Sequence, residues 1–228
     1  MMNAEEIESS ALNYILVKPD GFTPDGAYPL LVFLHGFGAS MYDLASLAPA
    51  LDAKGYVYAF PNAPYTVSLG FGSTGFSWSG DRPGVQPTSE TRDVETLLDA
   101  TVAEVAAATG ARPGNIGLGG FSQGAGLTLK HGLLRPGTFT ALTVLSGFFR
   151  DADTIKPKLP PQRTQPVFLV HGRQDQMIPL AQAHDTKRFL EEAGYPVEYH
   201  EYDMPHTITD AVLSDLRPWL HQKLPPKP

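Results

Sequence analysis

The sequence contains no cysteine in its 228 residues. A chain without cysteine forms no disulfide bond, offers no thiolate to a metal ion and has no cysteine nucleophile. Covalent catalysis in such a chain would need another nucleophile, such as a serine hydroxyl activated by a nearby base. This absence therefore directs attention to serine.

Long apolar runs and an excess of basic residues are also missing. No stretch is apolar over the length needed to span a bilayer, so we expect no membrane span. Residues 1–10 carry three glutamates and lack the basic and apolar regions of a secretory signal, which predicts a cytoplasmic enzyme. The 17 Lys and Arg are outnumbered by 24 Asp and Glu and form no cluster, so we expect no nucleic-acid partner.

The hydrophobic pattern predicts strands that alternate with helices. Short apolar or alternating runs predict strands at residues 12–18, 30–34, 57–60, 116–121, 140–145, 166–170 and 197–202. Apolar residues at helical spacing predict helices at residues 42–52, 89–109, 123–134, 180–193 and 209–220, with Ser89 as the N-cap of the second. The expected fold is one α/β domain over residues 1–228, with a mostly parallel sheet, helices on both faces and no large cap domain.

Three segments depart from this alternation. Residues 12–18 are expected to form an edge strand, followed by turns that give a hairpin-like opening. Residues 62–87 are rich in Gly, Ser, Pro and aromatic residues without a sustained period, which favours an ordered loop lining a binding cleft. Residues 151–164 are expected to form a proline-rich loop.

The stretch around Ser122 carries the strongest chemical signal. The apolar run Ile116–Phe121 leads at once into a segment with helical character, and Gly120 and Gly124 flank Ser122 at spacing two. This Gly-x-Ser-x-Gly pattern between a strand and a helix is typical of a nucleophile elbow, where the serine hydroxyl is exposed and only small residues fit on either side. Ser122 is therefore the predicted nucleophile.

A serine nucleophile needs a histidine base and a carboxylate that orients it, which follow in the chain order Ser, acid, His. Four histidines qualify as the base in this order: His184, His200, His206 and His221. Only His206 is expected in a loop leaving a strand, so it is the predicted base. His35 and His171, each at a strand end before a glycine, are interpreted as packing or hydrogen-bonding residues.

The acid has three candidates. Asp175 follows the strand just before the one that leads to His206, in a tight turn anchored by Ile178, and is favoured. Asp151 and Asp153 follow the preceding strand and remain a positional alternative, because a carboxylate from that loop could also reach the imidazole.

An oxyanion hole would complete the site. Backbone N–H groups from the residue after the nucleophile and from a loop after a central strand commonly hold the developing negative charge. Gln123 is the residue after Ser122, and Phe37 lies in the glycine-rich loop after the strand Leu30–Leu34. Their amides are the predicted donors.

Four motifs stand together in this chain: His35-Gly36-Phe37-Gly38, Gly120-Phe121-Ser122-Gln123-Gly124, His171-Gly172-x-x-Asp175 and His206. In this combination the sequence resembles the phospholipase/carboxylesterase family of α/β-hydrolases, which includes small bacterial carboxylesterases and acyl-protein thioesterases. The resemblance implies an α/β-hydrolase fold, Ser122, Asp175 and His206 as the catalytic triad, and Phe37 and Gln123 as oxyanion donors. It does not distinguish esters, thioesters and lysophospholipids.

These observations predict a serine carboxylesterase that hydrolyses short to medium acyl esters through an acyl-enzyme, without metal or organic cofactor, as a monomer or homodimer. An acyl-protein or acyl-CoA thioesterase or a lysophospholipase is the alternative within the same chemistry. A non-catalytic binding module on a hydrolase fold is the alternative from another class. The expected walls of the substrate site are Phe71, Phe76, Trp78, Phe148, Met177 and Ile178.

Overall fold

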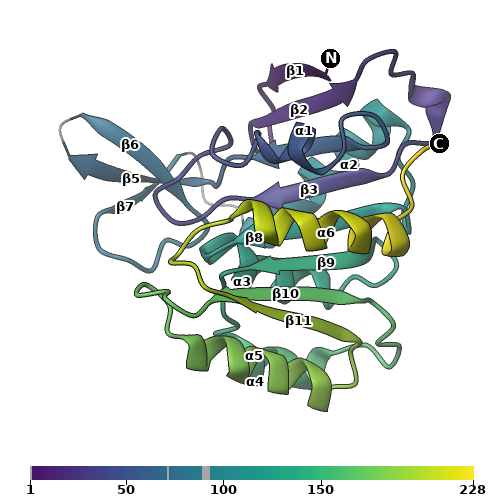
Figure 1. Cartoon of the computed structure of the whole chain (residues 1–228). Coiled ribbons are helices and arrows are strands. Elements are labelled where there is room, and N and C mark those ends of the chain that lie inside the picture. Colours follow the sequence, from purple (N-terminus) through teal and green to yellow (C-terminus); the bar gives the residue numbers. More distant parts are fainter. Residues whose placement is uncertain (1, 71, 89–92) are drawn as a thin grey trace.

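The computed structural model describes residues 2–70, 72–88 and 93–228 and is built around an eight-stranded sheet (Figure 1). The strands lie in the order β1-β2-β4-β3-β8-β9-β10-β11. All neighbours from β4 to β11 pair in parallel, whereas β1 and β2 pair antiparallel at one edge. Their bounds are β1 Met2–Ile7, β2 Tyr14–Pro19, β3 Leu30–Leu34, β4 Val57–Pro61, β8 Ile116–Phe121, β9 Phe139–Leu145, β10 Val167–Gly172 and β11 Val197–Tyr202.

Helices cover both faces of this sheet, as predicted (Figure 1). In β3, Leu30, Val32 and Leu34 enter one core and Leu31 and Phe33 enter the other, because successive side chains of a strand point to opposite faces. The first core also receives α2 (Val94–Thr109), α3 (Gln123–Gly132) and α5 (Leu180–Glu192). The second receives α1 (Leu47–Leu51) and α6 (Asp210–Lys223).

The segment expected to be a long loop contains a second sheet instead. β5 (Tyr65–Gly70) pairs antiparallel with both β6 (Ser73–Ser77) and β7 (Val85–Pro87). Gly70 and Gly72 have φ of 86° and 81°, so the tight turn between β5 and β6 uses a backbone conformation that favours glycine. Gly and Ser have low strand propensity, which is why the pattern of this segment did not predict strands.

The N-terminal edge of the main sheet also differs from the prediction. The expected edge strand is β2, and it lies inside the sheet between β1 and β4. The edge is β1, whose polar sequence gives little strand signal, and Lys18 of β2 pairs with Glu5 of β1 at 3.0 Å. β1 and β2 form an antiparallel hairpin, but it precedes the turns at residues 19–26 that were expected to give one, and β4 separates β2 from β3 in the sheet.

Three further segments start or end differently from the prediction. Helix α1 is much shorter than the expected helix at 42–52, because residues 41–46 form turns. Helix α2 begins at Val94 with Asp93 as its N-cap, whose carboxylate accepts a hydrogen bond from the Thr96 amide at 3.1 Å; the predicted cap, Ser89, lies outside the described residues. Residues 151–164 include α4 (Ala152–Ile155) and a 3-10 helix (Lys156–Lys158), and another 3-10 turn is Pro24–Gly26.

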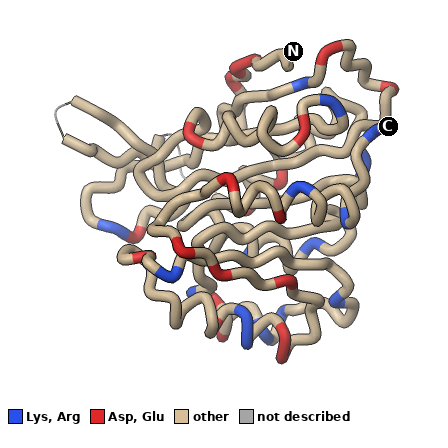
Figure 2. Tube along the Cα trace, in the orientation of Figure 1, with Lys and Arg blue, Asp and Glu red and all other residues tan. Residues whose placement is uncertain are grey.

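Charged residues are spread over the molecule rather than gathered on one side. In Figure 2, Lys and Arg alternate with Asp and Glu along the outer helices and loops, and the central strands carry few of either. Of the helices in the described residues, none combines the length and apolar character needed to cross a membrane.

Candidate active site

Ser122 occupies the turn from β8 into α3. Its φ of 55° and ψ of −115° place a non-glycine residue in a rarely adopted conformation. A Cβ atom on Gly120 would lie 2.4 Å from the backbone of Gly124, and one on Gly124 would lie 2.1 Å from the carbonyl oxygen of Leu34. These contacts explain why the turn requires glycine on both sides of the serine.

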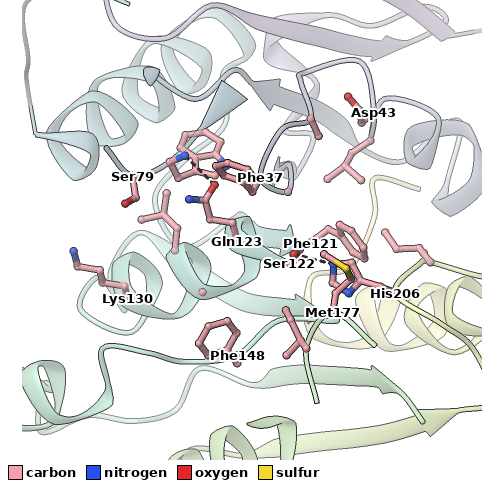
Figure 3. Close-up of a pocket in the computed structure, with 18 of the residues that line it drawn as sticks. Phe37, Asp43, Ser79, Phe121, Ser122, Gln123, Lys130, Phe148, Met177 and His206 are labelled. Carbon is pink, nitrogen blue, oxygen red and sulfur yellow. Dashed lines mark hydrogen bonds between the residues drawn. The ribbon is translucent and has the colours of Figure 1, made fainter. Parts of the chain in front are cut away.

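His206 lies in the loop between β11 and α6 and faces Ser122 (Figure 3). Its Nε2 is 2.9 Å from the Ser122 hydroxyl oxygen, and its Nδ1 is 2.7 Å from Asp175 Oδ2. The ring of Phe121 packs against the imidazole with a centroid separation of 4.7 Å. The three predicted side chains therefore form one hydrogen-bonded chain, supported by a phenyl ring that was not expected to take part.

Asp175 is held by the turn after β10. Its side chain is fully buried, and its Oδ1 accepts hydrogen bonds from the amides of Met177 and Ile178, both at 2.9 Å. Burial alone would raise the pKa of Asp175, but the Ile178 amide, the contact with His206 and the Met177 amide outweigh it and lower that pKa below its ordinary value. The carboxylate therefore stays ionised beside the imidazole.

A second histidine supports this turn. His171, at the end of β10, is fully buried, and its Nε2 lies 2.9 Å from the carbonyl oxygen of Ile178 and 3.4 Å from Asp175 Oδ2. The hydrogen bond to the carbonyl requires the proton on Nε2, so the ring braces both the carboxylate and the backbone that holds it. This agrees with the predicted hydrogen-bonding role of His171.

In the described part of the chain, no alternative candidate bonds to the Asp175–His206–Ser122 chain, although Asp151 lines the same cavity. Among the described residues, neither Asp151 nor Asp153 hydrogen-bonds to His206; Asp151 begins α4, where its backbone carbonyl accepts from Thr154 and Ile155. The other three histidines considered for the base pair with carboxylates away from Ser122: His184 with Glu201, His200 with Glu198 and His221 with Asp52.

The loop after β3 is fixed by the small sheet. The Gly38 amide donates to the Phe76 carbonyl at 2.8 Å, and the Phe76 amide donates to the Ala39 carbonyl at 2.9 Å. These two bonds lie directly after Phe37, whose amide, like that of Gln123, has no acceptor among the described residues. The assignment of these two amides as oxyanion donors stays a prediction.

A cavity of about 1230 Å³ surrounds Ser122 and His206. Four of the six predicted wall residues line it, namely Trp78, Phe148, Met177 and Ile178. Phe76 does not contribute to this lining; its ring packs edge-on against His35 at 6.4 Å, and its backbone holds the Phe37 loop. Phe71 lies outside the described residues.

The side chain of Gln123, which the sequence did not single out, crosses from the elbow to the small sheet. Its Oε1 accepts from the Trp78 amide at 3.0 Å, and its Nε2 donates to the Ser77 hydroxyl at 3.0 Å. Polar Gln123 in an otherwise glycine-rich and apolar motif was the available signal, but its partners lie 45 and 46 residues away in the chain and have no spacing that would identify them.

His35 packs beneath the Phe37 loop and is 1% exposed. Its Nε2 accepts from the Ala63 amide at 3.1 Å, so the proton is on Nδ1, which donates to the Gly36 carbonyl at 2.7 Å. Burial lowers the pKa of His35 to about 4, although the Gly36 carbonyl and the charge of Asp43 oppose the shift. A proton on Nε2 would face the Ala63 N–H, so the neutral ring fits this place.

Because the pKa of His35 is lowered in the folded protein, we expect the free energy of unfolding to fall in acid. Between about pH 6.5 and 4 the unfolded chain binds a proton at His35 and the folded chain does not, so the free energy of unfolding falls as pH falls through this window, by at most about 3 kcal/mol. Urea unfolding of the wild type and of His35→Gln at pH 7.5 and 4.5 measures the difference. An equal acid loss in both proteins would contradict this assignment.

The comparisons with known proteins place the chain in a family. A model of the family described as phospholipase/carboxylesterase matches residues 24–224. A probable carboxylesterase of Oryza sativa subsp. japonica is 29% identical over 216 residues, covering 90% of this chain and 92% of that protein. Acyl-protein thioesterase 1 of Kluyveromyces lactis is 31% identical over 212 residues, covering 86% and 91%. The crystal structure of SOBER1 from Arabidopsis thaliana has a TM-score of 0.71 at 27% identity, covering 87% of this chain and all of that one.

The parallel sheet with helices on both faces, and the serine at the turn from β8 into α3, define an α/β-hydrolase. Within that fold, the chain belongs to the phospholipase/carboxylesterase family. The family resemblance and the fold class predicted from the sequence are both confirmed, and the membership makes this protein a hydrolase of the serine type.

Proposed function

We propose that the protein is a carboxylesterase that hydrolyses short to medium acyl esters through an acyl-enzyme on Ser122. The observation that carries this proposal is the hydrogen-bonded chain from Asp175 through His206 to Ser122, which opens into the cavity. A serine, an imidazole and a buried carboxylate in this order are the groups that acyl transfer to serine requires.

In the acylation step, His206 Nε2 takes the proton of the Ser122 hydroxyl as its oxygen attacks the ester carbonyl. The negative charge that develops on the carbonyl oxygen is held by the amides of Phe37 and Gln123. His206 then gives its proton to the leaving alcohol as the ester C–O bond breaks. Asp175 accepts from Nδ1, so it fixes the tautomer and stabilises the imidazolium.

In the deacylation step, a water molecule takes the place of the alcohol. His206 removes its proton, the resulting hydroxide attacks the acyl carbonyl, and the same two amides hold the second oxyanion. Return of the proton to Ser122 releases the carboxylic acid and restores the starting enzyme. No other group is needed for the two half-reactions to balance.

The cavity walls support a limit on acyl length. The apolar Leu127 and Phe148 line the cavity, and so do Lys130 and Glu95, which pair at 3.2 Å. An acyl chain long enough to reach this ion pair would have to desolvate it, which costs free energy. Short and medium chains would stop at the apolar walls.

We therefore expect kcat/KM for p-nitrophenyl esters to be highest at short or medium acyl chains and to fall for long ones. The panel is measured below the critical micelle concentration of each ester, so that aggregation does not enter the comparison. Equal kcat/KM for short and long chains would contradict the length limit but would leave the proposed acyl-enzyme unaffected.

The acyl-enzyme itself is tested with a fluorophosphonate probe, which reacts with activated serines. Intact mass should show a single adduct, and peptide mapping should place it on Ser122. No adduct on folded protein, or an adduct on another serine, would overturn the proposal and favour a binding module on the same fold.

A thioesterase activity is the second candidate, because one relative over most of the chain is acyl-protein thioesterase 1 of Kluyveromyces lactis. The same chain of groups can cleave both bonds, so the bond type must be compared directly. Oxygen esters and thioesters with the same acyl group and matched leaving groups give the ratio of kcat/KM values. A ratio strongly favouring thioesters would replace the carboxylesterase assignment.

We further propose that residues 1–228 form one domain. The protein would be a monomer or a homodimer, and its substrates would be small-molecule esters. The family match over residues 24–224 supports a single unit. Light scattering coupled to gel filtration measures the oligomeric state, and a larger assembly would contradict this part.

A further inference from the structure

The side-chain amide of Gln123 connects the serine elbow to the small sheet. It projects from the start of α3 toward the side of the cavity that carries Ser79 and Phe37 (Figure 3). Its oxygen accepts from the Trp78 amide and its nitrogen donates to the Ser77 hydroxyl, which in turn donates to the Ser79 carbonyl at 2.7 Å. Both ends of the amide are therefore used within the protein.

Trp78 continues this connection to the loop of the other oxyanion donor. Its indole Nε1 donates to the backbone carbonyl of His35 at 2.8 Å, and its ring packs on the imidazole at 5.2 Å. Trp78 is 4% exposed, so little room exists for the ring to move. His35 and Gly36 lead directly into Phe37, the second predicted donor.

The two oxyanion donors are thus linked by a short chain of hydrogen bonds that does not pass through the main sheet. We call the side chains of Gln123 and Trp78, with the bonds they make to Ser77 and His35, the Gln123–Trp78 brace. An oxyanion hole works only when both N–H groups are held at the right separation before charge develops. The brace joins the segments that carry them.

We propose that Gln123 is a positioning residue, whose side chain sets the distance between its own amide and that of Phe37 through Trp78. This inference rests on the proposed acyl-enzyme reaction and adds a requirement to it. Backbone donors remain after a side-chain substitution, so changing the side chain at residue 123 leaves both N–H groups in place and removes only the means of holding them.

The test variant is Gln123→Met, which keeps the length of the side chain and removes its hydrogen bonds. We expect kcat for a short acyl ester to fall about 10- to 100-fold, because a small displacement of a catalytic donor has effects of that order. KM should change less than about threefold, since the side chain does not hold the substrate. Affinity for a trifluoromethyl ketone, which forms a tetrahedral adduct on serine, should fall in parallel with kcat.

The matched control is Gln165→Met. Gln165 is 3% exposed, and its Nε2 donates to the carbonyls of Gly132 and Phe139 at 3.0 and 2.9 Å, before β10 and at the opposite end of the sheet from Ser122. This variant also loses two buried hydrogen bonds. It should lower the melting temperature and leave kcat per titrated active site unchanged.

A second variant tests the other end of the brace. Trp78→Phe keeps a ring against His35 and removes the bond to its carbonyl. If both side chains act through one connection, the double variant Gln123→Met with Trp78→Phe should be little less active than the less active of the two single variants. If the two side chains acted independently, the fold losses of the single variants would multiply.

Amide exchange of Trp78 gives a readout that does not depend on activity. We expect its N–H to lose protection in Gln123→Met while the amides of β3 and β8 keep theirs. Unchanged kcat in Gln123→Met, a change in KM alone, or a loss equal to that of Gln165→Met would overturn the brace. Absence of both esterase activity and fluorophosphonate labelling in the wild type would instead overturn the proposed function, so the two failures are distinguishable.

Discussion

Replacing Ser122 with alanine should lower kcat for ester hydrolysis by about a millionfold, the loss typical of removing a serine nucleophile. The Ser122 oxygen lies 2.9 Å from His206 Nε2, and no acyl-enzyme can form without it. Slow attack by water, with both oxyanion amides still in place, would account for the residual rate. Stopped-flow measurement of the first turnover should also show that the burst of released alcohol has disappeared.

A fair control for this change is Ser146→Ala. Ser146 directly follows β9, is fully buried and has a φ of 48°, so it is another serine in the left-handed region. Among the described residues, its hydroxyl makes only a long bond of 3.5 Å, to the Thr207 carbonyl. Activity in this variant should stay within about fivefold of wild type, since weak polar contacts contribute little. A Ser122→Ala protein that retained more than about a hundredth of the wild-type rate would mean that hydrolysis does not proceed through this serine.

The elbow could be predicted because its constraints are local. Gly120 and Gly124 must be small for contacts within a few residues of Ser122 and with the neighbouring strand, so their spacing appears directly in the sequence. The positions of Asp175 and His206 followed from chain order and strand ends, because the carboxyl ends of parallel strands meet at one edge of a sheet. Site residues whose positions depend on sequence neighbours or on the geometry of a parallel sheet can therefore be predicted from the sequence.

Contacts between segments without a regular hydrophobic pattern could not be predicted from the sequence. β6 of the small sheet bonds to the Phe37 loop, and Gly75 is required there because a Cβ would lie 2.0 Å from the Gly38 carbonyl oxygen. The sequence shows only another glycine in a glycine-rich stretch. The same reason hid the role of Phe76, which was expected to touch substrate and instead holds the Phe37 loop through its backbone.

The choice among three acidic candidates depended on turn chemistry. Asp175 accepts from the amides two and three residues ahead, a local pattern that Asp side chains favour in turns. The sequence favoured Asp175 for its tight turn anchored by Ile178, and the structure adds these two bonds and the buried His171 behind the carboxylate. The hydrogen bonds to Oδ1 also determine how an asparagine side chain would be oriented at this position.

Replacing Asp175 with asparagine should lower kcat by about ten-thousandfold near neutral pH with little change in KM. The amides of Met177 and Ile178 donate to Oδ1, so the oxygen of the new side chain would stay toward them and its NH₂ group would face His206. An NH₂ group donates, which forces His206 to accept at Nδ1 and carry its proton on Nε2. A protonated Nε2 cannot remove the proton of Ser122.

The reverse orientation does not rescue the variant. It would place NH₂ against two backbone N–H groups, and leaving those buried donors unpaired costs about 1 to 3 kcal/mol each. It would also leave the NH₂ without an acceptor in a fully buried place. The wrong tautomer of His206 is therefore the more stable state, and the loss of activity follows from hydrogen-bond direction rather than from loss of structure.

The chain offers a close match for this change in Asp52. Its Oδ1 accepts from the amides of Lys54 and Gly55, both at 2.8 Å, and its Oδ2 lies 3.0 Å from His221 Nε2, so it repeats the geometry of Asp175 far from Ser122. Asp52→Asn should leave kcat unchanged. This control separates the loss of a carboxylate charge in such a turn from the change in the tautomer of His206. Nitrogen NMR of the imidazoles should show the His206 proton on Nδ1 in the wild type and on Nε2 in Asp175→Asn. Activity within about tenfold of wild type in Asp175→Asn, together with loss in Asp151→Asn, would move the orienting carboxylate to the loop after β9.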